Sequence, residues 1–380
     1  MIEMGEYART LAAFENGERE TKSTKAVKSS SKASTAYAEI PSAAGATKII
    51  RADSRNIPLP DSCVDLIVTS PPYWRKRDYG YPEQIGLEST PQEFVANIRA
   101  ALLEWRRLLK PTGSIFLNMG DTYHNKSLAG IPGRIEAAAC DDGWKLRNRI
   151  IWAKENGMPE PSKTRLANRH EYILHLTPTS NYYYDIVGYS EEYGNGANPG
   201  DVWRINLKRD MSKHLAPFPE EIVERAITLA CPKEVCSVCG HLRSRVFQRT
   251  AELDEGRPQA RRAMELAKEK GLTAAHIAAI QATGISDAGK ALRVQTGTGK
   301  NAEDVKRLAA EAKEALGGYF REFTFAKKRT VDWTKCSCNV DFRPAVVLDP
   351  FCGTGTTLRV ASAMGRIAIG VDLAPADISE

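Results

Sequence analysis

The segment from Thr69 to Trp74 (Thr-Ser-Pro-Pro-Tyr-Trp) combines residue types that can bind and orient an amino group on a flat ring. Two consecutive prolines remove two amide donors and stiffen the chain, so the Ser70 hydroxyl and nearby carbonyls become fixed acceptors. Acceptors that bind both amino hydrogens favour a more pyramidal nitrogen, while Tyr73 and Trp74 can hold the ring by stacking. The alternative is a proline-stiffened strand end with two core aromatic residues.

The second segment, Asp349 to Thr357 (Asp-Pro-Phe-Cys-Gly-Thr-Gly-Thr-Thr), places two glycines between an apolar run and a helical pattern. Glycines let the backbone approach a ligand closely, and the following helix start offers free amides. No lysine follows the second glycine, so the Walker phosphate-binding pattern is absent. Asp372 ends the next apolar run, where nucleotide-binding folds place a ribose-binding carboxylate. We therefore expect a nucleoside cofactor without a phosphate chain; a plain tight turn is the alternative.

Two cysteine pairs can supply four thiolates to one metal ion. Cys236 and Cys239 have the two-residue spacing of a zinc knuckle, and Cys336 and Cys338 are separated by one residue. The pairs are nearly a hundred residues apart, but they flank one Ala-, Lys-, Glu- and Arg-rich block, as a clasp at its base would. The pattern favours structural zinc over free thiols.

The apolar pattern around these segments predicts the elements that position them. Thr90 followed by Pro91 and by Glu93 is the start signal of a helix that runs to about Leu109. Further helices are expected over 220–230 and 356–364. Strands are expected over 48–53, 64–70, 114–118, 146–152, 171–176, 345–349 and 367–371. Strands alternating with helices predict an α/β sheet covered on both faces.

Composition adds mild constraints. The formal net charge is +6, from 53 Lys and Arg against 47 Asp and Glu, which permits a polyanionic partner without requiring one. Residues 1–47 include a Ser-, Lys- and Ala-rich stretch and are expected to form a flexible basic arm, which is a solvated tail or a nucleic-acid contact. No apolar run has membrane-spanning length and no signal pattern opens the chain, so we expect a cytoplasmic protein without a membrane partner.

The two loops together resemble those of the amino-directed DNA methyltransferases. Thr69 to Trp74 is similar to their catalytic loop and Asp349 to Gly355 to their cofactor loop, in the circularly permuted order of the beta group. The resemblance implies a Rossmann-like, S-adenosylmethionine-dependent methyltransferase sheet, with a catalytic domain over 48–232 and 341–380. Residues 233–340 are then a helical, zinc-clasped insertion that is a candidate for target recognition.

The resemblance also implies roles for individual residues. The catalytic site is expected to comprise Ser70, Pro71, Pro72 and Tyr73. The cofactor site is expected to comprise Asp53, Lys213, His214, Asp349, Pro350, Phe351, Gly353, Gly355, Thr356 and Asp372. Contacts with DNA are expected from Trp74, Lys163, Arg165 and Arg169, three of which lie in a basic stretch that could meet phosphates.

In this family a catalytic loop that opens with Ser usually accompanies methylation of cytosine N4, whereas Asp or Asn accompanies adenine N6. Ser70 therefore favours cytosine N4, by correlation alone, and adenine N6 is the first alternative. A non-catalytic DNA-binding zinc protein is the second. The expected partner is double-stranded DNA with a flipped target base. A homodimer, a cognate restriction endonuclease and a prokaryotic or phage source also fit the resemblance.

Overall fold

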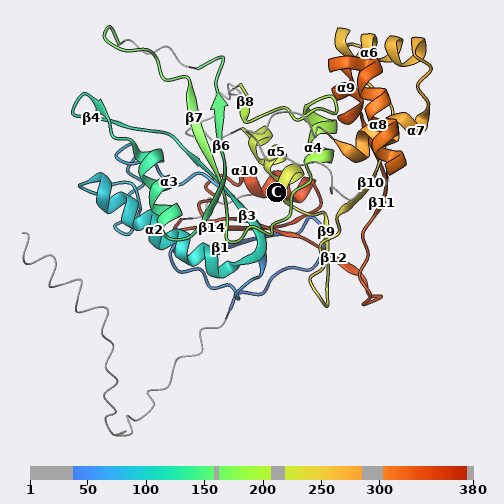
Figure 1. Ribbon diagram of the computed structural model, residues 1–380. Helices are drawn as coiled ribbons and strands as arrows, with labels where there is room; N and C mark the ends of the chain where they lie inside the picture. Colours follow the sequence, from blue (N-terminus) through green and yellow to red (C-terminus); the bar gives the residue numbers. More distant parts are fainter. Residues whose placement is uncertain (1–36, 158–161, 207–218, 285–302, 375–380) are drawn as a thin grey trace, which may run out of the picture. The chain divides into compact units, whose positions relative to one another are not determined.

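The computed structural model describes residues 37–157, 162–206, 219–284 and 303–374. Its centre is an eight-stranded sheet (Figure 1). In spatial order the strands are β1 (Thr47–Arg51), β14 (Ile367–Asp372), β13 (Val346–Asp349), β2 (Val64–Thr69), β3 (Leu109–Met119), β7 (His170–Thr177), β6 (Lys145–Ala153) and β8 (Val202–Arg204). The first five strands are mutually parallel, and β7 runs antiparallel to both β3 and β6.

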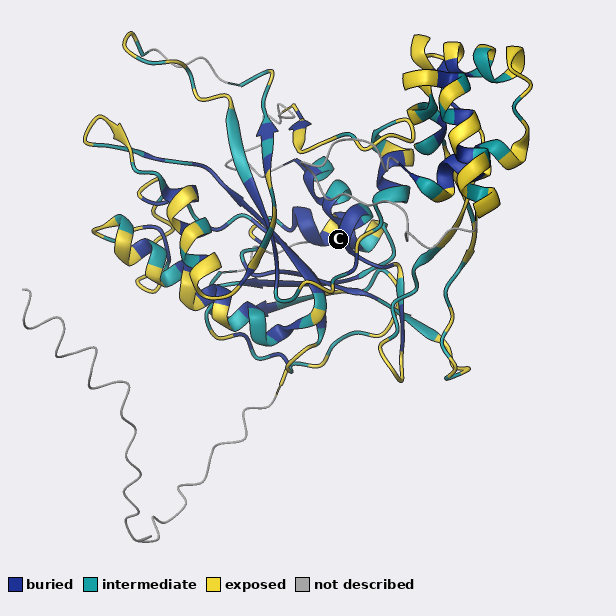
Figure 2. Cartoon of the chain, in the orientation of Figure 1, coloured by how far each residue is buried: buried dark blue, intermediate teal, exposed yellow. Residues whose placement is uncertain are grey.

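Helices cover both faces of the sheet, as the sequence predicts. One face packs against α2 (Pro91–Leu108) and α3 (Ile131–Asp141), and the other against α4 (Ile186–Tyr193), α5 (Glu220–Ala230) and α10 (Thr356–Ala363). All six residues of β2 are buried, which explains why its sequence is an apolar run rather than an alternating pattern. Figure 2 shows the dark blue strands enclosed between the two helical layers.

The start of α2 follows the predicted capping box. The Thr90 hydroxyl accepts a hydrogen bond from the backbone N–H of Glu93 at 3.2 Å, and the Glu93 carboxylate accepts one from the backbone N–H of Thr90. This reciprocal pair satisfies two of the amides that a helix start leaves free. The helix buries Phe94, Ile98 and Trp105 against the sheet and leads directly into β3.

The folded domain begins before residue 48, the start predicted from the sequence. We expected a flexible arm through residue 47, but the backbone N–H of Ala38 donates to the Pro58 carbonyl at 2.7 Å, and Ala38 and Ile40 pack against the core. Residues 37–46 therefore belong to the folded domain. The remainder of the predicted arm, residues 1–36, lies outside the described residues.

The insertion has a core of its own. It contains α6 (Pro258–Glu269), α7 (Ala274–Thr283), α8 (Glu303–Leu316), the 3-10 helix η1 (Gly317–Tyr319) and α9 (Phe320–Thr324). Leu253, Ile280, Leu316 and Phe323 are buried together between these helices. The insertion is not wholly helical as expected, because β10 (Arg245–Arg249) and β11 (Lys328–Trp333) form an antiparallel ribbon that leads to the helical block.

Two further strand pairs complete the fold: β9 (Glu234–Cys236) with β12 (Phe342–Pro344), and β4 (Tyr123–His124) with β5 (Ser127–Leu128). Among the described residues no helix is both long and apolar enough to cross a lipid bilayer.

Candidate active site and cysteine cluster

The two predicted loops lie side by side because β2 and β13 are parallel neighbours in the sheet. Parallel strands bring their carboxyl ends to the same edge, so the Ser70 loop and the glycine turn emerge together there. A direct bond joins the strand ends: the Thr69 hydroxyl donates to Asp349 Oδ1 at 2.6 Å. We call this side of the sheet the carboxyl edge.

Asp349 is buried, and its carboxylate is occupied by groups of the protein itself. Besides Thr69, the backbone N–H of Phe351 donates to Oδ1 at 3.1 Å, and the Thr357 hydroxyl donates to Oδ2 at 2.6 Å. Burial raises the pKa of Asp349 to about 6, although these hydrogen bonds oppose the shift. The sequence predicts that Asp349 belongs to the cofactor site. In the structure its carboxylate connects the Ser70 loop to the glycine turn.

The glycine turn leaves room for a ligand. Gly353 has φ 47° and Gly355 φ 79°, in the left-handed region that favours glycine, and a Cβ on Gly353 would meet nothing within 4 Å. The backbone N–H of Gly353 donates to Asp372 Oδ2 at 3.0 Å. At the start of α10 the buried Thr356 hydroxyl has no hydrogen-bond partner within the part of the chain that the structure describes.

The structure describes some of the other predicted cofactor residues and not others. Arg51 of β1 pairs with Asp372 of β14, so Asp53 and Asp372 follow neighbouring strands at the carboxyl edge. Burial opposes ionisation of Asp53, but hydrogen bonds from Arg55 outweigh it and lower its pKa. The half-buried ring of Phe351 meets Trp105 edge to face, and Pro350 stands before it in the turn. Lys213 and His214 lie outside the described residues.

In the catalytic loop, Ser70, Pro72 and Tyr73 are half-buried and Pro71 is buried. The ring of Tyr73 lies against Gly120, where a Cβ would come within 2.7 Å of Tyr73 Cε2. The prediction for Trp74 was wrong: its side chain is fully buried, and its indole N–H donates to the Glu88 carbonyl at 2.9 Å. A core tryptophan cannot stack on a base, so only Tyr73 remains as the aromatic platform of this loop.

A polar network beside Tyr73 was missed by the sequence analysis. The Tyr73 hydroxyl donates to Glu171 Oε2 at 2.5 Å, and Lys154 forms an ion pair with Glu171 Oε1. Asn118 Nδ2 donates to Tyr73 Oη and to Glu171 Oε2, each at 2.9 Å, and to Ser70 Oγ at 3.3 Å. Burial, followed by the charge of Glu171, raises the pKa of Tyr73 well above 10.

Glu171 and Lys154 reach the carboxyl edge because β7 is antiparallel to β3. Glu171 is near the start of β7 and Lys154 follows the end of β6, so both lie where the parallel strands end. The only signal in the sequence was an acid at the start of an apolar strand, and the direction of that strand could not be read from it.

The four predicted cysteines meet in one cluster. The sulfurs of Cys236, Cys239, Cys336 and Cys338 all lie within 4.8 Å of one another. Four thiolates around a tetrahedral zinc ion would be about 3.8 Å apart, which this cluster can reach with small adjustments. The backbone N–H groups of Cys239 and Val238 lower the pKa of Cys236 to about 6. The strands β9 and β12, which pair Cys236 with Phe342, hold the two halves together.

The cysteine cluster lies away from the carboxyl edge. β12 ends at Pro344 and β13 begins at Val346, so the cluster is attached where β13 starts, whereas Asp349 and the glycine turn follow the other end of the strand (Figure 1). Its position therefore suits a structural role at the base of the insertion.

Comparison with known proteins decides the family. A sequence profile described as DNA methylase matches residues 64–236 and 335–379, more than half of the chain, and both loops lie inside the matched stretches. The chain belongs to the DNA methylase family. Its members methylate amino nitrogens of bases, N6 or N4, and the enzyme described here is accordingly a DNA methyltransferase. Residues 237–334, which include the helical block, lie outside the match.

Two curated relatives and one solved structure are similar to this chain. The type II methyltransferase M.Cfr9I of Citrobacter freundii is 37% identical over 200 residues, covering 44% of this chain and 67% of the relative. M.SmaI of Serratia marcescens is 33% identical over 215 residues, covering 47% and 74%. Among solved structures, the PvuII DNA methyltransferase (cytosine-N4-specific) superimposes with a TM-score of 0.49 and 15% identity, over 89% of this chain and 86% of that one.

The basic residues predicted to contact DNA lie in the connection between β6 and β7. Lys163 and Arg169 are exposed, and Arg169 Nη1 donates to the Gly157 carbonyl at 2.6 Å. The guanidinium of Arg165 lies 3.6 Å from the ring centre of Tyr123. Between these cations the side chain of Leu166 is 91% exposed. This connection leaves and re-enters the sheet beside Lys154 and Glu171, next to the catalytic loop.

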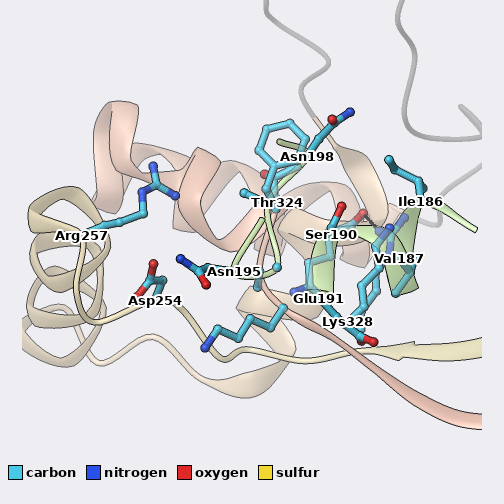
Figure 3. Close-up of a pocket in the computed structure, with 17 residues that line it drawn as sticks. Ile186, Val187, Ser190, Glu191, Asn195, Asn198, Asp254, Arg257, Thr324 and Lys328 are labelled. Carbon is cyan, nitrogen blue, oxygen red and sulfur yellow. Dashed lines mark hydrogen bonds between the residues drawn. The ribbon is translucent and has the colours of Figure 1, made fainter. Parts of the chain in front are cut away.

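A cavity of about 840 Å³ lies elsewhere, between α4 with the loop after it and the insertion (Figure 3). Its lining includes Glu191, Asn195, Asp254, Arg257 and Lys328, and it contains no residue of the Ser70 loop or of the glycine turn. The candidate active site at the carboxyl edge is therefore separate from this cavity.

Proposed function

We propose that the enzyme transfers a methyl group from S-adenosylmethionine to the exocyclic N4 of cytosine in double-stranded DNA. The observation that carries the proposal is Ser70 at the head of a Ser-Pro-Pro-Tyr loop, bonded through Thr69 and Asp349 to a glycine turn at the same edge of the sheet. Family membership supports methyl transfer to a base amino group, and Ser70 is the reason for choosing cytosine N4 over adenine N6.

The residues of the glycine turn suit S-adenosylmethionine. Gly353 leaves open space beside the backbone, and Gly355 has a positive φ. The Thr356 hydroxyl is a buried group without a partner among the described residues, and Asp372 can accept from ribose hydroxyls. Asp53 follows the neighbouring strand β1 and would lie near the adenine ring of the cofactor. When bound, the sulfonium cofactor supplies an electrophilic methyl group. No cationic phosphate site is needed for such a ligand.

The catalytic loop would act mainly by orienting the base. Pro71 and Pro72 fix the loop, so that acceptors such as Ser70 Oγ do not reorganise during the reaction. The Tyr73 ring, held against Gly120, offers the stacking face for a base that has left the duplex. Holding the amino nitrogen in line with the methyl group replaces a bimolecular encounter by a positioned one, which can lower the barrier by several kcal/mol.

The proposal is tested by methyl transfer from labelled S-adenosylmethionine to unmethylated duplex DNA, followed by nucleoside mass spectrometry. We expect N4-methylcytosine from the wild type and none from Tyr73→Ala, with Ser70→Ala reduced. N6-methyladenine instead would retain the fold and the mechanism but overturn the choice of cytosine. Cofactor binding without any methylated base would contradict DNA as the substrate.

We also propose that the four clustered cysteines bind one structural zinc ion. Their sulfurs come from both ends of the insertion, so the ion would close the insertion at its base, where it emerges from the catalytic domain. Elemental analysis of the purified protein should find one zinc per chain. A protein that contains no metal and whose melting temperature is unchanged by a chelator would contradict this proposal.

The proposed DNA contacts are the basic connection, Lys163, Arg165 and Arg169, and the inserted helical block, which is the candidate for target recognition. Cations that neutralise phosphates release counterions, so replacing Lys163 and Arg169 by Ala should weaken binding and reduce its salt dependence. Equal salt slopes for variant and wild type would exclude both residues from the interface.

We further propose that the enzyme forms a homodimer, which light scattering would test. We also propose that a cognate restriction endonuclease exists, because several relatives are named type II methyltransferases.

A further inference from the structure

The network around Glu171 contains more polar groups than stacking alone requires. Four elements contribute to it: the loop after β2 supplies Ser70 and Tyr73, β3 supplies Asn118, the end of β6 supplies Lys154, and β7 supplies Glu171. All of these side chains are buried or half-buried. An aromatic platform needs only a fixed ring, and a phenylalanine could provide one, so the hydrogen-bonded hydroxyl of Tyr73 calls for a further role.

Methylation of an amino group requires an acceptor for one proton. The nitrogen lone pair forms the bond to the methyl carbon, and the carbon–sulfur bond of the methylsulfonium breaks with its electron pair left on sulfur. The nitrogen is then positively charged and must release a proton to give the neutral methylamino product. The enzyme can accelerate the reaction if a suitably placed group receives that proton.

We propose that Glu171 is the final acceptor of this proton and acts through Tyr73 and Ser70. The amino group gives its proton to Ser70 Oγ, Ser70 passes its own to Tyr73 Oη, and Tyr73 passes its own to Glu171. The hydrogen bonds in the structure already run in this direction, from Ser70 Oγ to Tyr73 Oη at 3.5 Å and from Tyr73 Oη to Glu171 Oε2 at 2.5 Å. The longer first step is one that can shorten when substrate binds. This inference rests on the proposed function.

Other groups at the carboxyl edge are less suited to the task. Asp349 already accepts three hydrogen bonds from Thr69, Phe351 and Thr357, and both oxygens of Asp372 accept backbone N–H groups. Serine and tyrosine hydroxyls are weak bases that hold their protons near neutral pH and can only hand them on.

Asn118 and Lys154 hold the acceptor in place. Asn118 Nδ2 lies within hydrogen-bond distance of all three members of the chain, so its two hydrogens can hold these side chains together. Lys154 and Tyr73 are the titratable side chains seen to contact Glu171. Lys154 forms an ion pair with Oε1, whereas Tyr73 donates its hydrogen bond to Oε2. Glu171 is therefore a positioning residue that acts through Tyr73.

The test compares single-turnover rates of Glu171→Gln, Tyr73→Phe and the double variant with those of the wild type. Glutamine keeps an acceptor for Tyr73 but is not basic, and phenylalanine keeps the stacking face but not the hydroxyl. We expect each single variant to lose about 100-fold in rate, as for other general bases, with KM for S-adenosylmethionine nearly unchanged. The double variant should be no slower than the singles, because the residues act as one unit. Glu155→Gln, at an exposed neighbouring acid, is the matched control and should retain the wild-type rate.

A pH profile separates proton transfer from mere support of the loop. The wild-type rate should show an acid limb that is absent from Glu171→Gln, because glutamine cannot accept the proton that the relay delivers. Rates within threefold of the wild type, or losses that multiply in the double variant, would overturn the relay. If Glu171→Gln fails to fold, as thermal melting would reveal, Tyr73→Phe alone decides, because its ring still fills the site. A wild type that methylates no base would instead contradict the proposed function.

Discussion

The carboxyl edge and the cysteine cluster are both built from residues that are distant in sequence, but they are built for different purposes. At the carboxyl edge, Ser70 follows β2, Asn118 lies in β3 and Glu171 lies in β7. The Thr356 hydroxyl there has no hydrogen-bond partner among the described residues. At the cysteine cluster, the four sulfurs lie within 4.8 Å of one another. We propose that the first arrangement serves the methyl-transfer reaction and that the second closes the insertion at its base.

The two regions are separated in the fold. The insertion has its own core and leaves the catalytic domain at β9 and β12, at the end of β13 that is remote from the glycine turn. Changes at the cluster should therefore alter stability and DNA recognition, whereas changes at the carboxyl edge should alter the rate.

Tyr73→Ala should have the largest effect on the rate. The substitution removes the stacking face and the hydroxyl bonded to Glu171, so methyl transfer should fall by more than 100-fold, or about 3 kcal/mol. Rates are measured under single-turnover conditions, with zinc content and thermal melting as checks on folding. An active variant would show that the reaction takes place elsewhere.

Cys239→Ser should lower the stability of the protein and leave S-adenosylmethionine binding intact. Loss of one ligand should release the metal and lower the melting temperature by several degrees, because the energy of metal binding supports folding of the insertion. Cys140→Ser changes an exposed cysteine outside the cluster and should leave both quantities unchanged. S-adenosylmethionine binding, measured by calorimetry, should survive in both variants; its loss in Cys239→Ser alone would break the separation of the two regions.

Gly120→Ala should reduce the rate by about tenfold, or 1.4 kcal/mol. The new Cβ would lie 2.7 Å from Tyr73 Cε2, so the ring must move away from its position beside Asn118. Gly133→Ala in α3 is the matched control, since its Cβ would meet nothing within 4 Å and alanine favours a helix. Equal rates for the two variants would mean that the position of the Tyr73 ring is not critical.

Asp349 should give a small pH effect on stability. Its pKa is raised from 3.8 to about 6 in the folded protein, so the folded state holds a proton that the unfolded state has already lost. This contribution is fully present below pH 4 and is lost as pH rises through 6. Between pH 5 and pH 8 the wild type should lose about 1 kcal/mol of unfolding free energy relative to Asp349→Asn. Denaturant titrations at both pH values check this, and a constant difference would contradict the shift.

The strands and both loops could be predicted because their signals are local. Buried strands such as β2 and β13 are apolar runs, and the loops that follow them carry proline or glycine at fixed positions. Trp74 was misjudged because a tryptophan beside a polar loop has the same sequence whether it faces a ligand or the core. Its burial is decided by contacts with residues such as Glu88, fourteen positions away.

The sequence alone could not predict that Glu171 and Lys154 join the candidate site, or that β10 and β11 form a ribbon. An acid at the start of an apolar strand becomes part of the site only if the strand is antiparallel to its neighbour, as β7 is to β3. The ribbon adjoins segments with strong helical composition, and its strands pair residues about eighty positions apart. Pairing over such distances is set by the whole fold rather than by local preference.

The most direct test of the account is the identity of the methylated base in DNA from cells that express the enzyme. The DNA is digested to nucleosides and analysed by mass spectrometry, with cells expressing Tyr73→Ala as the reference. We expect N4-methylcytosine in the wild-type sample and its absence from the reference. N6-methyladenine that depends on Tyr73, with no N4-methylcytosine, would contradict the assignment that rests on Ser70.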